Sequence, residues 1–165
     1  MKNFNTLYLS LILISTSLSA SDKLYSFMGI QAGNSFVDGN SVPTIGLKYG
    51  KQTKKYRTSI TYAYGEKSNS NYQSLIAQVD TGILLNQFKN SSLKPYAGLS
   101  FGVMQEENKQ ASVKDKGYVY GANTGIAYIF NDALDFDLSY RYMATSKLKN
   151  LSSLNDLTLS MHYFY

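Results

Sequence analysis

The chain has 165 residues, a formal net charge of +5 and no cysteine. This length fits one domain, or one domain plus a processed segment. The lack of cysteine excludes a disulfide-stapled secreted scaffold and a thiolate metal site. A charge of this size is weak evidence for nucleic acid, so we expect no nucleic-acid partner.

The first twenty residues have the pattern of a secretory signal peptide. Lys2 supplies a positive charge, residues 7–14 (LYLSLILI) are largely apolar, and small residues follow up to Ala20. The apolar stretch is too short for a membrane anchor, which needs about 20 apolar residues. We predict a cleaved signal peptide at 1–20 and an exported domain at 21–165, with several small-x-small sites leaving the cleaved bond open.

Apolar and polar residues alternate along most of the chain after Lys23, which predicts strands rather than helices. Eight strands are expected in chain order, at roughly 24–36, 42–51, 55–65, 72–87, 93–105, 117–130, 134–144 and 155–165. Each has about ten residues or more, the length that a tilted membrane strand needs. The exported domain is therefore a soluble β-protein or a membrane β-barrel.

The expected connections favour the membrane barrel. The odd-numbered ones (37–41, 66–71, 106–116 and 145–154) are mostly longer and richer in charge, Ser and Asn than the even-numbered ones (52–54, 88–92 and 131–133). Outer-membrane barrels have long outer loops and short periplasmic turns. The pattern predicts that both termini lie in the periplasm.

One parity of the strands carries aromatic residues near the ends and aliphatic or small residues between them. In three strands this set is Tyr56, Thr58, Ile60, Tyr62, Tyr64; Tyr118, Tyr120, Ala122, Thr124, Ile126, Tyr128, Phe130; and Phe136, Leu138, Tyr140, Tyr142. Aromatic girdles around an apolar band have this distribution, so these side chains are expected to face lipid.

The opposite parity carries glycines and charges. The glycines are Gly29, Gly33, Gly46, Gly50, Gly65, Gly82, Gly98, Gly102, Gly121 and Gly125. The charges are Lys48, Arg57, Asp80, Asp135, Asp137 and Arg141. An ion that faced lipid at mid-depth would cost about 2–4 kcal/mol, whereas inside an eight-stranded barrel opposite charges can pair between small residues. We predict a lumen polar network of these six residues and His162.

The last strand alternates up to the final residue. Its apolar parity is Leu157, Leu159, Met161, Tyr163 and Tyr165. As an exposed edge this strand would invite aggregation. We expect it to pair with both the seventh and the first strand, which closes the cylinder and satisfies every backbone group.

Three segments carry a family resemblance: LKYGKQTKKYRTSITYAYGEKS (47–68), LKPYAGLSFGV (93–103) and YGANTGIAYIFNDALDFDLSYRYM (120–143). The sequence resembles the small outer-membrane β-barrel family that includes OmpX, Ail, the Opa adhesins and the OmpA barrel domain. The resemblance implies an all-β, eight-stranded antiparallel transmembrane barrel in the Gram-negative outer membrane, without a cofactor. It also implies that the five terminal apolar residues form the signal that the barrel assembly machinery reads, although Tyr165 replaces the more usual Phe.

Catalytic interpretations are weaker than structural ones. A lipid A deacylase of the PagL type requires His-x-Ser and a carboxylate, but the order here is Ser160-Met161-His162. A palmitoyltransferase barrel of the PagP kind would begin with an amphipathic helix, for which residues 21–23 leave no room. Asp135 and Asp137 suit pairing with Arg57, Lys48 or Arg141 better than paired-carboxylate catalysis.

Two further site patterns are also unconvincing. Gly98–Gly102 matches Gly-x-Ser-x-Gly, but it lies within a continuous strand and not at the strand-to-helix turn of a hydrolase. A single histidine and scattered carboxylates predict no metal site.

The expected loops leave the role of the domain open. Residues 144–154 are basic, with Lys147 and Lys149, and also carry Leu148, Leu151 and Leu154. The two lysines are candidate contacts for lipopolysaccharide phosphates or an anionic host surface. We therefore expect a monomer with a structural or adhesin-like role in contact with lipid, lipopolysaccharide or a host factor. A narrow channel and, less favoured, a lipid A-modifying enzyme are the alternatives.

Overall fold

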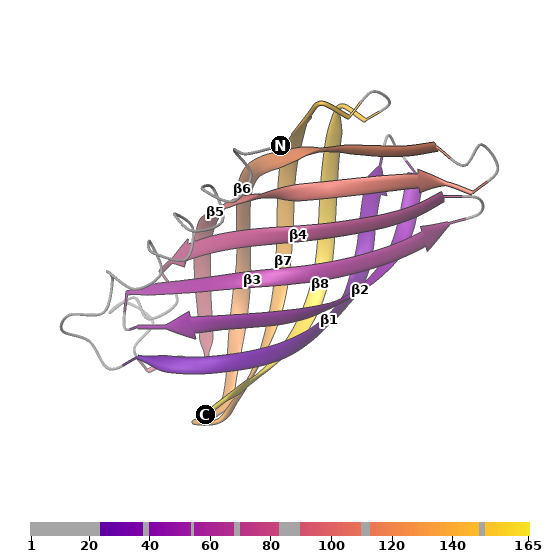
Figure 1. Ribbon diagram of the computed structural model, residues 1–165. Helices are drawn as coiled ribbons and strands as arrows, with labels where there is room; N and C mark the ends of the chain where they lie inside the picture. Colours follow the sequence, from indigo (N-terminus) through magenta and orange to yellow (C-terminus); the bar gives the residue numbers. More distant parts are fainter. Residues whose placement is uncertain are drawn as a thin grey trace.

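Eight antiparallel strands close into one barrel in chain order (Figure 1). The computed structural model describes residues 24–37, 40–53, 55–67, 70–82, 90–109, 113–148 and 151–165, so the predicted signal peptide lies outside the described residues. The strands are β1 (Tyr25–Val37), β2 (Asn40–Gln52), β3 (Tyr56–Lys67), β4 (Ser70–Thr81), β5 (Leu93–Asn108), β6 (Val113–Asn131), β7 (Leu134–Ser146) and β8 (Ser153–Phe164). This confirms the all-β, eight-stranded fold.

The barrel closes through its last strand, as the sequence predicted. β8 pairs with β7 and also with β1, from Phe27↔Phe164 to Val37↔Leu154. Beyond the strand, the Tyr165 N–H donates to the Ser26 carbonyl at 3.0 Å. The chain therefore leaves no free edge between its first and last strands. None of the described segments is a helix long and apolar enough to cross a membrane.

The fourth strand is shorter than predicted. β4 ends at Thr81, and Gly82 follows with φ of 101°, a conformation that glycine adopts far more readily than other residues. The apolar residues that follow Gly82 in the sequence prolonged the predicted strand to residue 87. Gly82 is therefore not a lumen-facing strand residue, and residues 83–89 lie outside the described residues.

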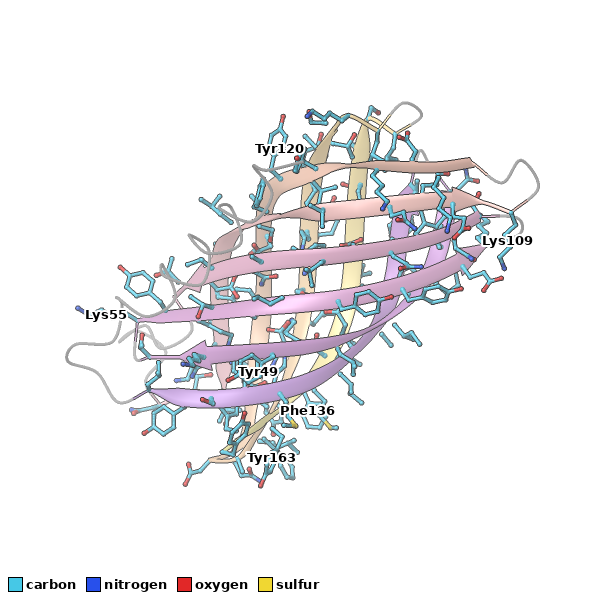
Figure 2. The ribbon with its side chains drawn as sticks, viewed as in Figure 1. Tyr49, Lys55, Lys109, Tyr120, Phe136 and Tyr163 are labelled. Atoms are coloured by element: carbon cyan, nitrogen blue, oxygen red, sulfur yellow. The ribbon has the colours of Figure 1, made fainter. Side chains whose placement is uncertain are left out.

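The expected difference in connection length is wrong, because the connections at one end of the barrel are not systematically longer than those at the other. We call the end of the barrel that holds the connections 38–39, 68–69, 109–112 and 147–152 the loop end, and the opposite end, where β1 begins and β8 finishes, the terminal end. Lys109 and Lys55 lie at these two opposite ends (Figure 2). The longest connection, 82–92, lies at the terminal end, where only short turns were predicted.

Pairing beyond the predicted strand ends accounts for the shorter loops. β5 and β6 pair as far as Asn108↔Val113, so the predicted loop 106–116 is mostly strand. A membrane strand needs only about 9–11 residues, and the 19 residues of β6 exceed that length. The excess places a charged hairpin at the loop end.

The outward parity is apolar and exposed, as predicted. Leu99, Ile45 and Leu159 are 70%, 66% and 58% exposed. The predicted outward aromatic residues of β3, β6 and β7 are also exposed or half-buried. Such a surface would be unfavourable in water but suits the hydrocarbon of a bilayer.

Glycine allows close contact between strands at the inward parity. A Cβ added to Gly121 on β6 would lie 1.9 Å from the carbonyl oxygen of Tyr142 on β7. Since that atom is backbone, only movement of a strand could make room for the added carbon. The other predicted strand glycines except Gly82 also lie on the inward parity.

The interior has two zones of different chemistry. Toward the terminal end it holds buried ions and amides. At the loop end it holds an apolar group that we call the loop-end cluster: Val37, Val42, Ile76, Met104, Val119, Met143, Leu148, Leu151 and Leu154. Leu148 and Leu151 belong to the connection 147–152, so these two side chains pack onto the barrel mouth.

Candidate functional site

Arg57 on β3 is the centre of the polar zone nearer the terminal end. Its side chain is 2% exposed and contacts two carboxylates of β7, with Nη2 at 2.5 Å from Asp135 Oδ2 and Nη1 at 3.7 Å from Asp137 Oδ2. Its Nε donates to Gln52 Oε1 at 2.7 Å. The pairs span the interior, because β3 and β7 are not neighbours in the sheet. Of the three partners expected for the two aspartates, the structure selects Arg57.

His162 extends this group onto β8. It is fully buried, its Nδ1 lies 2.7 Å from Asp135 Oδ1, and its ring lies 4.9 Å from that of Phe27. Among the described residues its Nε2 has no hydrogen-bond partner. Ser160 is therefore not within hydrogen-bond reach of Nε2, as a serine nucleophile and its base would be.

A second group surrounds Arg141 on β7. Arg141 Nη1 lies 3.4 Å from Asp156 Oδ2, and its Nη2 donates to Gln78 Oε1 at 3.0 Å. The Gln78 amide in turn donates to Asp80, which also accepts from Asn123 Nδ2 at 2.6 Å. Asp80 is thus held by amides and connected to Arg141 through Gln78.

Lys48 on β2 makes a separate contact. Its Nζ donates to Ser160 Oγ at 3.5 Å, and the side chain is buried. All seven residues of the predicted lumen polar network are buried, and all seven lie at strand positions that face the interior. The structure joins Arg57, Asp135, Asp137 and His162 directly, and joins Arg141 to Asp80 through one amide.

Sequence reasoning overlooked two interior ions, Lys94 and Asp156. Both are buried, and both follow the parity rule that identified the others, because Asp156 shares its strand face with His162 and Lys94 shares its face with Tyr96. Including them, the described interior carries four cations (Lys48, Arg57, Lys94, Arg141) and four aspartates (Asp80, Asp135, Asp137, Asp156). Buried charges of both signs in equal number suit a filled ionic core.

The described interior contains a small cavity. A cavity lined by Gln31, Thr44, Asp156 and Thr158, among others, has a volume of about 20 Å³, which is room for about one water molecule. At the terminal end an open vestibule of about 730 Å³ reaches Lys94 and Asp135. At the other end the loop-end cluster fills the mouth.

The rim at the loop end carries charges outside the interior. Lys109 pairs with Glu66, and Lys114 Nζ lies 3.0 Å from Glu107 Oε1. Lys147, one of the two predicted loop contacts, has φ of 68°, and its Nζ lies 5.2 Å from the centroid of the Tyr118 ring. Lys149 lies outside the described residues.

The terminal residues expected to form an assembly signal face outward. Leu157, Leu159, Met161 and Tyr163 alternate with buried neighbours along β8, and Tyr165 follows as an exposed ring. They form one apolar strip along the wall.

Two chemical patterns have structural explanations. The segment Gly98–Gly102 lies within β5, where Ser100 is buried and donates to Asn123 Oδ1 at 2.8 Å. This geometry differs from a hydrolase nucleophile turn. Within the described ranges, no three His, Cys, Asp or Glu residues are grouped so that they would hold a metal ion.

The closed barrel, its apolar wall and its ionic interior define a small outer-membrane β-barrel protein. The family described as outer membrane protein beta-barrel domain matches residues 3–163. The chain belongs to this family, and it is located in the Gram-negative outer membrane. A search of curated proteins finds no match.

Solved structures with the same fold have different activities. Neisserial surface protein A superimposes with a TM-score of 0.69 at 14% identity over 88% of this chain and 100% of that one. Ail, the attachment invasion locus protein of Yersinia pestis, gives 0.54 at 15% identity over 88% and 100%. The outer membrane enzyme PagL gives 0.53 at 12% identity over 83% and 98%. At these identities the likeness concerns the fold alone.

Proposed function

We propose that this protein is a non-enzymatic barrel with a structural and surface-interaction role in the outer membrane. The observation that carries this proposal is the ionic interior, in which Arg57 connects β3 to Asp135 and Asp137 across the barrel. An interior occupied by ion pairs leaves the outer wall and the loop end as the surfaces available to partners.

In the surface-interaction role, Lys147 and Lys149 contact lipopolysaccharide or a host factor. Its support is the basic connection at the loop end and the fold shared with Ail, a protein named for attachment and invasion. Eight strands bring both termini to the same end of the barrel. We take that end to be periplasmic, as in outer-membrane barrels with short periplasmic turns, so that the loop end faces outside the cell.

Charge reversal tests the surface role better than deletion. Deleting the connection 147–152 would also remove Leu148 and Leu151 from the loop-end cluster, so lost binding would have two explanations. Lys147→Glu with Lys149→Glu keeps these leucines. Cells that display this variant are expected to lose attachment to host cells and matrix, whereas Lys55→Glu at the opposite end serves as the control. Unchanged attachment by the double variant would overturn the adhesin-like role.

A narrow channel is the alternative that the terminal-end vestibule favours. The vestibule has a volume of about 730 Å³, but its wall includes Asp135, which Arg57 and His162 contact. We expect no stable conductance from the refolded protein in planar bilayers. Steady unitary currents that disappear in Asp80→Asn or Arg141→Gln would establish the channel instead.

A lipid A-modifying activity has less support, although the enzyme PagL has the same fold. His162 is fully buried between Asp135 and Phe27, whereas a general base must reach its substrate. We expect the mass spectrum of lipid A to be the same in cells with the wild-type protein and with His162→Ala. A modification that the substitution abolishes would contradict this proposal.

The protein is further proposed to be exported through residues 1–20, inserted by the barrel assembly machinery through its terminal apolar strip, and monomeric. An exposed aromatic strip at the end of the chain supports the second point. Replacing Tyr165 with Asp is expected to reduce the folded, heat-modifiable fraction in the outer membrane, whereas Tyr165→Phe is expected to retain it.

A further inference from the structure

The outer wall has a depression at the loop end whose lining changes from apolar to basic. Its volume is about 490 Å³, and Leu75, Val103, Gln105, Lys116, Tyr118 and Lys147 contribute to it. These residues come from β4, β5, β6 and the connection after β7. The depression therefore crosses several strands on the lipid-facing side, close to the rim.

Two cations of this depression lack carboxylate partners within the described part of the chain. The outward carboxylates of the rim, Glu66 and Glu107, pair with Lys109 and Lys114. Neither Lys116 nor Lys147 takes part in an ion pair among the described residues. Positive charge therefore remains uncompensated at this place, where an anionic group would be attracted.

The side chains below the two lysines suit the other parts of a lipid. Lys147 Nζ lies over the Tyr118 ring, which stacks on Phe101 with a centroid distance of 6.4 Å and an interplanar angle of 15°. Leu75 and Val103 continue the outward apolar surface and are 44% and 43% exposed. A membrane lipid bound here would place its headgroup at the cation, its interfacial part at the aromatic ring and its acyl chains at the aliphatic side chains.

The same wall provides an internal comparison. A second depression of about 580 Å³ is lined by Ile30, Ile45, Leu47, Leu159 and Met161, among others, and no charged residue lines it. Acyl chains can fill either depression, but only the one with Lys116 and Lys147 can also hold a phosphate. The difference indicates a lipid recognised through its headgroup.

We propose that this depression binds a phosphorylated glycolipid of the outer leaflet, the lipid A part of lipopolysaccharide. Lys116 and Lys147 contact a phosphate, Tyr118 lies at headgroup level, and Leu75 and Val103 contact acyl chains. The inference rests on the proposed function, because it takes the loop end to face the outer leaflet. The inference names lipid A as the partner and places its binding site on the outer wall beside the rim, not at the tip of the connection that carries Lys149.

Native mass spectrometry of the refolded mature chain tests the site. The probes are bisphosphorylated lipid A, its dephosphorylated form and phosphatidylglycerol, each titrated in the same detergent. Lys116→Gln with Lys147→Gln is expected to weaken bisphosphorylated lipid A binding about thirtyfold, since each of the two cations near an anionic lipid surface contributes about 1 kcal/mol. The control, Lys109→Gln with Lys114→Gln, removes the same charge from paired positions and is expected to change binding less than threefold.

The outcomes separate the possible explanations. Equal weakening by both double variants would show that net charge alone attracts the lipid and would overturn the site. Equal binding of dephosphorylated lipid A, or of phosphatidylglycerol, would overturn the assignment of the headgroup. The two experiments can also disagree. If cells with Lys147→Glu and Lys149→Glu lose host attachment while Lys116→Gln with Lys147→Gln leaves lipid A binding unchanged, this inference is contradicted and the proposed function stands. If host attachment is unchanged while lipid A binding is weakened, the inference is supported and the adhesin-like role is contradicted.

Discussion

At the scale of the residue, Arg57 explains most about how the interior is organised. Its guanidinium donates to Asp135 and lies 3.7 Å from Asp137 Oδ2 on the far side of the barrel, and the ring centroids of Phe27 and Phe164 lie 5.2 and 5.8 Å from its Cζ. A planar group with several donors can serve two carboxylates at once, which lysine does less well. Burial of these ions is tolerated because they are paired.

Removing Arg57 leaves two buried carboxylates without their cation. Arg57→Ala is expected to lower the free energy of unfolding by about 3–5 kcal/mol. Urea titration in phosphatidylcholine vesicles, followed by the gel shift between folded and unfolded forms, measures the change. Lys55→Ala at the exposed turn is the control, with an expected change within about 0.5 kcal/mol. Equal urea midpoints for Arg57→Ala and Lys55→Ala would show that the contacts of Arg57 with Asp135 and Asp137 do not stabilise the barrel.

Strand parity predicted which charges are buried, but it did not predict which of them pair. Arg57, Asp80 and Arg141 could be assigned to the interior because alternation fixes the face of each strand residue. Partner choice depends on how far each strand is shifted along its neighbours and on side-chain rotamers, which a single strand does not contain. For this reason Asp80 is held by Gln78 and Asn123 instead of a cation.

At the scale of the element, close contact between β6 and β7 depends on Gly121. Since a Cβ there would meet the backbone of Tyr142, Gly121→Val is expected to cost about 1–3 kcal/mol through overpacking and to lower the refolding yield. Urea midpoints and yield measure the effect. The neighbouring Ala122→Val places its added methyl groups in lipid and is the control. If Gly121→Val is as stable as Ala122→Val, close contact between β6 and β7 does not depend on glycine at position 121.

The connection between β7 and β8 is held by its leucines. Leu151 is buried in the loop-end cluster, and its carbonyl accepts a hydrogen bond from Thr145 Oγ1. Leu151→Ala is expected to cost about 2–5 kcal/mol and to speed tryptic cleavage after Lys147 or Lys149. Ser152→Ala, at an exposed position, is the control for both measurements. Unchanged cleavage and stability in Leu151→Ala would show that the cluster does not fasten the connection.

The sequence predicted the existence of strands better than their ends. Alternation identified all eight, because each strand separates lipid from a packed interior along its whole length. It failed at β4, where apolar residues continue beyond Gly82 although the strand ends at Thr81. It also failed for the leucines of 147–152, because packing of a connection onto the mouth leaves no periodic signal.

At the scale of the whole molecule, the barrel separates two tasks. The interior fixes the shape through paired ions toward one end and the apolar loop-end cluster at the other. The outer wall and rim face the surroundings, and within the described residues Lys116 and Lys147 take part in no ion pair. A barrel built in this way can vary its surface while its interior remains the same.

The account depends above all on which solvent the outward residues meet. The chain has no native cysteine, so single cysteines can be introduced at Ile60, Leu99 and Leu159 and spin-labelled in reconstituted vesicles, with Lys55 and Ser152 as water-exposed references. The three wall labels are predicted to collide readily with oxygen dissolved in the bilayer and to be protected from a water-soluble nickel reagent that reaches both references. Nickel access to the wall labels equal to that at Lys55 and Ser152 would contradict the membrane barrel.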